Sequence, residues 1–216
     1  MVQPAACLFD LDGLLLDTEP LHARAWQEAA SHFGRPLRPA ELMALRGRRR
    51  LDCAQQVLQW IEAAGGASLS CDALLEVRQP IAEALLVHAQ PMPGARELVA
   101  RCCELGVPMA LATSSSRQAV ALKAAPHPWL AAISTRVHGD DTELTAGKPA
   151  PDVFLLAAAR LGVAASGCWA FEDSLAGARA AAAAGCKVHV VAPEGADPQL
   201  YPAGVIHLSS LNQVPL

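Results

Sequence analysis

Three apolar runs of this sequence each end in polar residues that could act as nucleophiles, acids or metal ligands. The first run is followed by Asp10 and Asp12, the second by Thr113, and the third by Glu172 and Asp173. If these runs are neighbouring strands of an open parallel sheet, the polar residues meet at one edge, because such sheets bind ligands outside the carboxyl ends of their strands. The spacing therefore predicts a site assembled from distant parts of the chain.

Carboxylates dominate this predicted site, and four of them brought together repel one another. Such a cluster needs a cation, and ligands that are all oxygen atoms point to Mg²⁺. Lys148, which lies just before a predicted helix, could bring a further positive charge to the same edge.

These residue types suit the transfer of a phosphoryl group. A carboxylate can attack phosphorus and form an aspartyl phosphate. A magnesium ion and a lysine offset charge on the transferring group, while a hydroxyl and backbone N–H groups hold its oxygens. A second acid two residues from the nucleophile can protonate the leaving alcohol and later activate water.

The elements that must position these residues alternate between strands and helices. The apolar runs lack polar alternation, which is typical of parallel strands buried on both faces. We expect strands at 5–9, 107–112, 168–171 and 188–191, with a weaker one at 133–137. Helices are expected at 94–105, 115–124, 152–161 and 174–184. This alternation predicts an α/β fold with a doubly wound, Rossmann-like parallel sheet.

One stretch interrupts the alternation, because residues 16–88 contain no convincing strand and four predicted helices. In the first helix, Thr18 can cap the N-terminus, Pro20 lies in the first turn, and Trp26 lies on the apolar face. The others are expected at 39–45, 51–64 and 71–87. We therefore predict an all-helical cap domain at 16–88 inserted into a core domain formed by 1–15 and 89–216.

Composition excludes several classes of protein. The 216 residues are 52% hydrophobic and 18% charged, which excludes a disordered chain. The net charge of −4 disfavours a nucleic-acid partner. Seven scattered cysteines without a C-x-x-C pair indicate reduced thiols and a cytoplasmic protein. Neither a signal peptide nor a membrane span is expected, because no apolar run is long enough.

The motifs Asp10-Leu-Asp12-Gly13, Thr113, Lys148 and Glu172-Asp173 occur in this order. Together they resemble the haloacid dehalogenase-like phosphatase superfamily, and the helical insert resembles its small α-helical cap. The segment 10–26 is similar to the branch that contains beta-phosphoglucomutase and phosphoglycolate phosphatase. Segments 110–115 and 139–141 are similar to the pseudouridine-5'-phosphatases of that branch.

The resemblance implies a role for each motif. Asp10 is expected to be the nucleophile and Asp12 the general acid and base. The phosphoryl group is expected to bind Thr113, Ser114 and Lys148. The implied magnesium ligands are Asp10, the backbone carbonyl of Asp12, and Asp173, with Glu172 adjacent.

Three cap residues are candidates for substrate contacts. Arg50 matches a cap arginine that contacts substrate phosphate in the mutase-like relatives, although the arginine-rich turn at 46–50 also reads as a solvated turn, and Arg48 or Arg49 are alternatives. His22 matches a histidine near the cap hinge, or is a plain surface residue. Trp26 is a ligand contact or a core residue.

The leading hypothesis is a Mg²⁺-dependent phosphatase that acts on a small cytoplasmic phosphomonoester: a sugar phosphate, phosphoglycolate or a nucleoside monophosphate. A sugar phosphomutase is less favoured, because the mutase-like relatives use a cap lysine and residues 16–88 contain none, although Arg78 could substitute for it. A dehalogenase and a non-catalytic binding protein are further alternatives. We expect a monomer whose partner is a phosphorylated metabolite, with no nucleic-acid or membrane partner.

Overall fold

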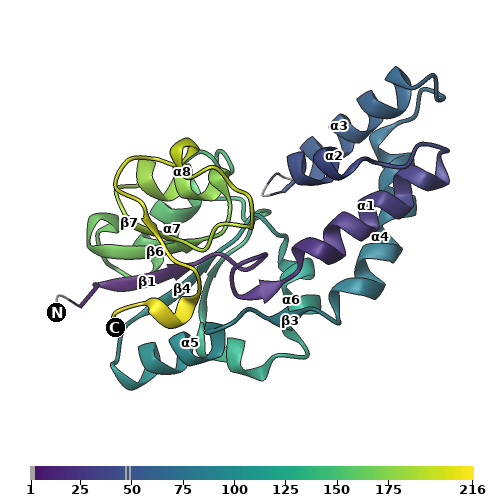
Figure 1. Cartoon of the computed structure of the whole chain (residues 1–216). Coiled ribbons are helices and arrows are strands. Elements are labelled where there is room, and N and C mark those ends of the chain that lie inside the picture. The colour runs from purple at the N-terminus through teal and green to yellow at the C-terminus, as the bar shows by residue number, and fades with distance from the viewer. Residues whose placement is uncertain (1–2, 47, 49) are drawn as a thin grey trace.

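The computed structural model describes residues 3–46, 48 and 50–216, and within them contains a six-stranded sheet, a two-stranded ribbon and eight α-helices (Figure 1). The strands of the large sheet are β1 (Ala6–Phe9), β4 (Met109–Ala112), β5 (Thr135–Val137), β6 (Cys168–Glu172), β7 (Lys187–Val190) and β8 (Ile206–His207). The helices are α1 (Glu19–His32), α2 (Pro39–Ala44), α3 (Arg50–Ala63), α4 (Cys71–Leu86), α5 (Ala95–Glu104), α6 (Arg117–Ala124), α7 (Asp152–Arg160) and α8 (Leu175–Ala183).

All neighbouring strands of the large sheet are parallel, in the order β5-β4-β1-β6-β7-β8. The chain leaves β1 for β4 on one side and later returns to β6 on the other. Ligands of doubly wound sheets bind where the strand order reverses in this way. The predicted doubly wound parallel sheet is confirmed, and β8 is a short edge strand that the sequence pattern did not predict.

Strand β1 is buried on both faces, which explains its continuous apolar sequence. Cys7 and Phe9 pack in one hydrophobic cluster with residues of α5, whereas Ala6 and Leu8 pack in another with residues of α7 and α8. All four side chains are fully buried. Burial of each large apolar side chain contributes roughly 1.5–3 kcal/mol, so the three layers hold the ends of the central strands in place.

Helices α1–α4 form a separate part of the molecule beside the sheet, as predicted for the insert (Figure 1). Their own hydrophobic cluster includes Trp26, Val57, Ile61 and Leu74. No helix of the described residues is long and apolar enough to cross a membrane.

The insert joins the core through a two-stranded antiparallel ribbon, β2 (Leu16–Asp17) with β3 (Gln90–Pro91). Leu16 pairs with Pro91 and Asp17 with Gln90, so the chain enters and leaves the insert at neighbouring points. The prediction of no strand between 16 and 88 was wrong for β2, whose two residues are too few to show a sequence period.

Serine side chains cap the helices that begin at the sheet edge. Ser116 accepts a hydrogen bond from the N–H of Ala119 in α6, and Ser174 accepts one from Gly177 in α8. Thr18 occupies the N-cap position of α1, but its side chain makes no capping bond, in contrast to the prediction. Its hydroxyl donates to Asp12 instead.

Candidate active site

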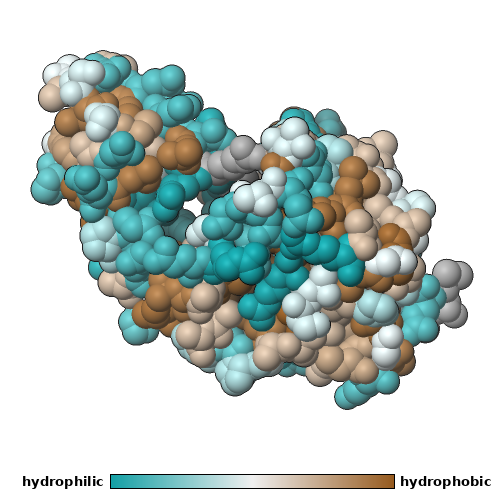
Figure 2. Space-filling model, turned by 180° about the vertical axis from the view of Figure 1, so that it is seen from behind, coloured by the Kyte–Doolittle hydropathy of each residue, from teal (hydrophilic) through white to brown (hydrophobic). Residues whose placement is uncertain are grey.

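A cavity of about 430 Å³ lies between the carboxyl edge of the sheet and the helical insert. The core side contributes Asp10, Thr113 and Lys148, and the insert contributes Trp26 and Arg78. Figure 2 shows from behind that the two parts of the molecule meet across a hollow with largely hydrophilic visible walls. The volume suits a small metabolite, because pockets for drug-sized ligands begin at roughly 300 Å³.

Three buried carboxylates meet at this edge. Asp10 follows β1, Glu172 ends the neighbouring β6, and Asp173 follows it. Phe9 of β1 pairs with Phe171 of β6, so the two strands end side by side. The N–H of Asp10 donates to the carbonyl of Phe171 at 3.0 Å. One oxygen from each carboxylate lies within 4.8 Å of the others, as in a metal site.

Lys148 inserts its ammonium group among these carboxylates. Nζ lies 2.5 Å from Oδ1 of Asp10 and also donates to Oε1 of Glu172. Burial lowers the pKa of Lys148, but the charges of and hydrogen bonds to Asp10 and Glu172 raise it by more. Lys148 is therefore a charged ammonium group at the edge of the sheet where the sequence analysis expected it.

One lysine does not offset all of the negative charge. Burial, with the nearby charges of Glu172 and Asp12, raises the pKa of Asp10 to about 7 although Lys148 opposes the shift. Burial and the charges of Glu172, Glu19 and Asp10 raise the pKa of Asp173 well above its usual range. A divalent cation would relieve this repulsion, and carboxylate oxygens are the ligands that hard cations prefer.

Asp12 lies outside the cluster of three carboxylates. Its oxygens accept hydrogen bonds from Lys123 at 2.5 and 2.6 Å, from Ser115 at 2.7 Å and from Thr18 at 2.7 Å. Burial raises the pKa of Asp12, but the charge of Lys123 and the hydrogen bonds from His22 and Lys123 hold it well below the usual range. The side chain of Asp12 thus faces a lysine, which leaves only its backbone carbonyl for the predicted metal site.

Sequence reasoning missed Lys123, although a signal was present. Val120 and Lys123 lie three residues apart on α6, and both are buried. A lysine on the apolar row of a helix needs a buried partner, because an unpaired charge is costly inside a protein. The sequence alone did not indicate that this partner is Asp12.

Thr113 and Ser114 follow β4 and line the same cavity as Asp10. Thr113 is almost fully buried, and its Oγ1 accepts a hydrogen bond from the N–H of Ser115 at 3.1 Å. Ser114 is partly exposed. The loop therefore presents hydroxyl groups to the cavity from the strand next to the one that carries Asp10.

Two glycines let the backbone approach the carboxylates closely. A Cβ atom at Gly177 in the first turn of α8 would lie 2.0 Å from Oε1 of Glu172. Gly13 has a φ of +81°, and a Cβ atom there would lie 2.2 Å from Oδ2 of Asp173. Neither position admits a side chain unless the neighbouring carboxylate moves.

His22 and Trp26 lie together at the insert side of the cavity, around a residue that the motifs did not assign. The guanidinium of Arg78 lies 4.1 Å from the ring centroid of Trp26, and its Nη2 lies 3.0 Å from Nδ1 of His22. Nε2 of His22 lies 3.5 Å from Oδ1 of Asp12. Trp26 is thus both a core residue and a wall of the cavity.

Arg78 is 5% exposed, and its Nε has no hydrogen-bond partner among the described residues. Burial lowers its pKa to about 10, so the group remains charged at neutral pH. A buried cation with an unused donor at a cavity wall suits an anionic or polar group of a ligand.

The described arginines of the 46–50 turn differ in their exposure and in their contacts. Arg50 lines the cavity, but it is exposed and donates to Gln79 at 3.0 Å. Arg46, which was not singled out, pairs with Glu19 at 3.2 Å and lies 3.8 Å from Asp173. Arg48 is exposed. Gly47 and Arg49 lie outside the described residues.

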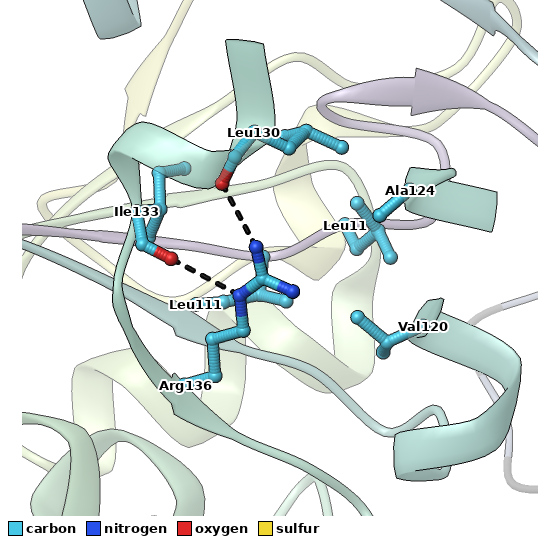
Figure 3. A pocket seen from close by; sticks show the side chains of 7 residues that line it. All are labelled: Leu11, Leu111, Val120, Ala124, Leu130, Ile133 and Arg136. Carbon is cyan, nitrogen blue, oxygen red and sulfur yellow. Dashed lines mark hydrogen bonds between the residues drawn. The ribbon is translucent and has the colours of Figure 1, made fainter. Parts of the chain in front are cut away.

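A second void, under the sheet, carries no chemistry. Its volume is about 10 Å³, close to the smallest space that holds one water molecule. Figure 3 shows that the guanidinium of Arg136 donates to the carbonyls of Leu130 and Ile133, beside the apolar lining. This void is a packing gap, and the larger cavity is the candidate active site.

Comparison with known proteins supports a single family. The sequence profile of the haloacid dehalogenase-like hydrolases matches residues 4–185. A protein of Drosophila melanogaster described as a probable pseudouridine-5'-phosphatase is 38% identical over 190 residues, which cover 86% of this chain and 80% of that protein. The fructose-1-phosphate phosphatase YqaB of Escherichia coli is 35% identical over 182 residues, which cover 84% of this chain and 93% of the enzyme.

A solved structure shows the same fold over almost the whole chain. The crystal structure of CbbY from Rhodobacter sphaeroides in complex with phosphate superimposes with a TM-score of 0.82 and 26% sequence identity. The alignment covers 99% of this chain and 97% of CbbY. The fold, including the helical insert, is therefore shared with a protein that binds phosphate.

Proposed function

This chain belongs to the haloacid dehalogenase-like hydrolase family, and we propose that it is a Mg²⁺-dependent phosphatase that works through an aspartyl phosphate on Asp10. Its named relatives support a phosphoric monoester hydrolase. The observation that carries the mechanism is the contact of Lys148 with Asp10 beside two further buried carboxylates. This arrangement pairs a nucleophile with the charges that phosphoryl transfer requires.

The donor set fits a divalent cation, because three carboxylates converge and the pKa values of Asp10 and Asp173 are raised by burial and by the repulsion of neighbouring carboxylates. Asp10, Asp173 and the backbone carbonyl of Asp12 would hold Mg²⁺, with Glu172 adjacent. When bound, the ion supplies positive charge that stabilises the oxygens of the transferring phosphoryl group.

The side chains at the sheet edge would bind the phosphoryl group, attack phosphorus and transfer protons. Lys148, Thr113 and Ser114 bind the phosphoryl oxygens, while a carboxylate oxygen of Asp10 attacks phosphorus. The ester P–O bond breaks, and Asp12, which is ionised in the unliganded site and takes up a proton when the negatively charged ester binds beside it, gives this proton to the departing alcohol oxygen. Asp12 then takes a proton from the water that attacks the aspartyl phosphate, which releases phosphate and restores Asp10.

The cavity suggests the class of substrate. Its volume of about 430 Å³ suits a small phosphomonoester, such as a sugar phosphate, phosphoglycolate or a nucleoside monophosphate. Arg78, His22 and Trp26 would contact the alcohol part, with Arg50 at the rim. The absence of lysine from residues 16–88 favours hydrolysis over mutase chemistry.

A panel of phosphate esters, assayed with Mg²⁺ and with EDTA, tests this proposal. We expect Mg²⁺-dependent release of phosphate from small phosphomonoesters, and no turnover by an Asp10→Asn variant that remains folded. Undiminished turnover by Asp10→Asn would refute Asp10 as the nucleophile. A coupled assay with beta-glucose 1-phosphate as substrate distinguishes a phosphomutase, which would form glucose 6-phosphate.

A further inference from the structure

Arg78 is a buried cation for which the described residues supply no counter-ion. It is 5% exposed, and although burial lowers its pKa, the value of about 10 leaves it charged at neutral pH. Its guanidinium lies 4.1 Å from the ring centroid of Trp26, and its Nη2 lies 3.0 Å from Nδ1 of His22. Neither neighbour is a carboxylate, and no other described residue forms an ion pair with Arg78.

Two other buried cations near this cavity each contact a carboxylate. Lys123 lies 2.5 Å from Asp12, and Lys148 lies 2.5 Å from Asp10. An unpaired charge inside a protein is costly, because little water solvates it. The charge of Arg78 is therefore the one for which a bound anion would complete the ion pair, whereas the described carboxylates already pair with the two lysines.

The position of Arg78 places such an anion close to the ester. Arg78 and Asp10 line the same cavity. The imidazole ring of His22 stands between Arg78 and Asp12, because its Nδ1 lies 3.0 Å from Nη2 of Arg78 and its Nε2 lies 3.5 Å from Oδ1 of Asp12. A group held by Arg78 thus lies one ring away from Asp12, only a few bonds from the ester oxygen.

The surroundings of Arg78 favour a carboxylate over a polyol. Arg78, Ala82 and Leu86 are spaced four residues apart on α4, so they form one row along the wall of the cavity. The two apolar side chains offer no hydrogen bonds to the hydroxyl groups of a sugar, and they screen a charge poorly. The planar guanidinium matches a carboxylate through two parallel hydrogen bonds, and the two single charges balance.

We propose that Arg78 binds a carboxylate of the substrate, so that the preferred substrate is the phosphate ester of a small hydroxy acid. This inference rests on the proposed phosphatase function and narrows its substrate class. The sheet edge with Lys148 would hold the phosphoryl group, and Arg78 of the insert would hold the carboxylate. A phosphate ester with a neutral alcohol part would leave the charge of Arg78 unpaired.

Two pairs of esters test the proposal, because the members of each pair differ only in a carboxylate that replaces a hydroxymethyl group. One pair is 2-phosphoglycolate and 2-hydroxyethyl phosphate, and the other is 2-phosphoglycerate and glycerol 2-phosphate. We would measure kcat/KM with Mg²⁺ and divide the value for the acid by the value for its neutral partner. The intrinsic reactivities of the two esters cancel when this ratio is compared between wild type and variant.

Arg78→Met is expected to lower the ratio at least about tenfold in both pairs, as for the loss of a hydrogen bond between charged groups. Arg78→Lys should lower it less, because lysine keeps the charge but lacks the planar fork. Arg24→Met is the matched control. Arg24 lies on α1 of the same insert, where it pairs with Glu28 at 2.7 Å on the exposed surface, so this variant should keep the wild-type ratio.

Urea unfolding with EDTA distinguishes substrate recognition from a structural role. Because methionine removes an unpaired buried charge, Arg78→Met without ligand should unfold at the same urea concentration as wild type or at a higher one. If this variant failed to fold, Arg78→Gln, which is uncharged but keeps hydrogen-bond donors, would provide the same comparison of ratios.

Two results would overturn this inference and leave the phosphatase function intact. One is an unchanged ratio in a folded variant that lacks the charge of Arg78. The other is a loss of the preference in Arg50→Met but not in Arg78→Met, which would place the carboxylate at the rim of the cavity. A wild-type protein that hydrolyses none of the four esters and no ester of the wider panel would instead refute the proposed function itself.

Discussion

Nζ of Lys148 lies 2.5 Å from Oδ1 of Asp10, although 138 residues separate them in the chain. Both side chains are almost fully buried, and Lys148 also donates to Glu172. In this setting a cation is worth more than in water, because little solvent screens its charge. The contact joins Asp10, the proposed nucleophile, to the loop before α7.

Lys148→Met should abolish most activity, because the variant removes the cation that contacts Asp10 and that we propose to bind the phosphoryl group. We expect kcat/KM to fall at least about 100-fold, as for the loss of one transition-state donor. Breaking a buried pair also costs about 3–5 kcal/mol, so the metal-free variant should unfold at lower denaturant concentration. Lys187→Met serves as the control, and a Lys148→Met protein with normal turnover would contradict this role.

Gly177→Ala should impair metal binding, because a Cβ atom would lie 2.0 Å from the carboxylate of Glu172. We expect at least a tenfold rise in the Mg²⁺ concentration that gives half-maximal activity, measured by titration, and weaker binding in calorimetry. Gly106→Ala is the matched control. It strains a φ of +65° with nothing within 4 Å, so it should lose about 1 kcal/mol of stability and keep its Mg²⁺ dependence.

Arg78→Met should weaken substrate binding more than the chemical step. Arg78 lies over Trp26 with its Nε unpartnered among the described residues, so it can donate to the alcohol part of a substrate. A hydrogen bond to a charged group is worth about 1.5–3 kcal/mol, and KM for the best ester of the panel should rise about tenfold or more. An unchanged KM with reduced stability would assign Arg78 a structural role only.

His189 should make the fold sensitive to acid. Burial, with the charge of Lys187, lowers the pKa of His189 to about 4, against 6.5 for the exposed side chain. The unfolded chain therefore binds a proton below pH 6.5 that the folded protein does not bind until about pH 4. The free energy of unfolding is therefore unaffected by His189 above pH 6.5, and it decreases as the pH falls from 6.5 to about 4.

The size of this effect is measurable. A shift of this size corresponds to up to about 3 kcal/mol of unfolding free energy. In His189→Leu that share of the acid dependence should disappear, as measured by urea unfolding at pH 7 and pH 4 with EDTA present. The ring lies 4.9 Å from Trp169 and 5.0 Å from Phe171, and leucine retains most of this packing. The prediction would be contradicted if the free energy of unfolding fell by the same amount from pH 7 to pH 4 in the wild-type protein and in His189→Leu.

The sheet and the polar carboxyl edge of its central strands could be predicted from the sequence, because strands buried on both faces leave long apolar runs. Asp10, Thr113 and Glu172 stand at the ends of such runs, and the parallel order brings them together. Lys148 precedes its helix and meets the same edge, as its position indicated.

The remaining features depend on contacts between distant segments. Lys123 shows no motif, and its partner lies 111 residues away. Thr18 has the sequence of a helix cap, yet its own backbone is helical (φ −96°, ψ −18°) rather than extended as in a cap residue, so its side chain makes no capping bond and its hydroxyl donates to Asp12. Arg78 belongs to a helix whose partner α1 is far earlier in the chain, so its stacking on Trp26 emerges only from the packing.

The ribbon of β2 and β3 has a consequence for how such proteins diversify. Because Leu16 pairs with Pro91 and Asp17 with Gln90, the insert begins and ends at adjacent points of the core. The insert thus takes the place of the loop that would join the two strands of a hairpin. Its sequence can drift, lengthen or be exchanged while the carboxylates and Lys148 stay in place on the sheet. Selection for new phosphate esters can therefore act on one module without rebuilding the chemistry of the other.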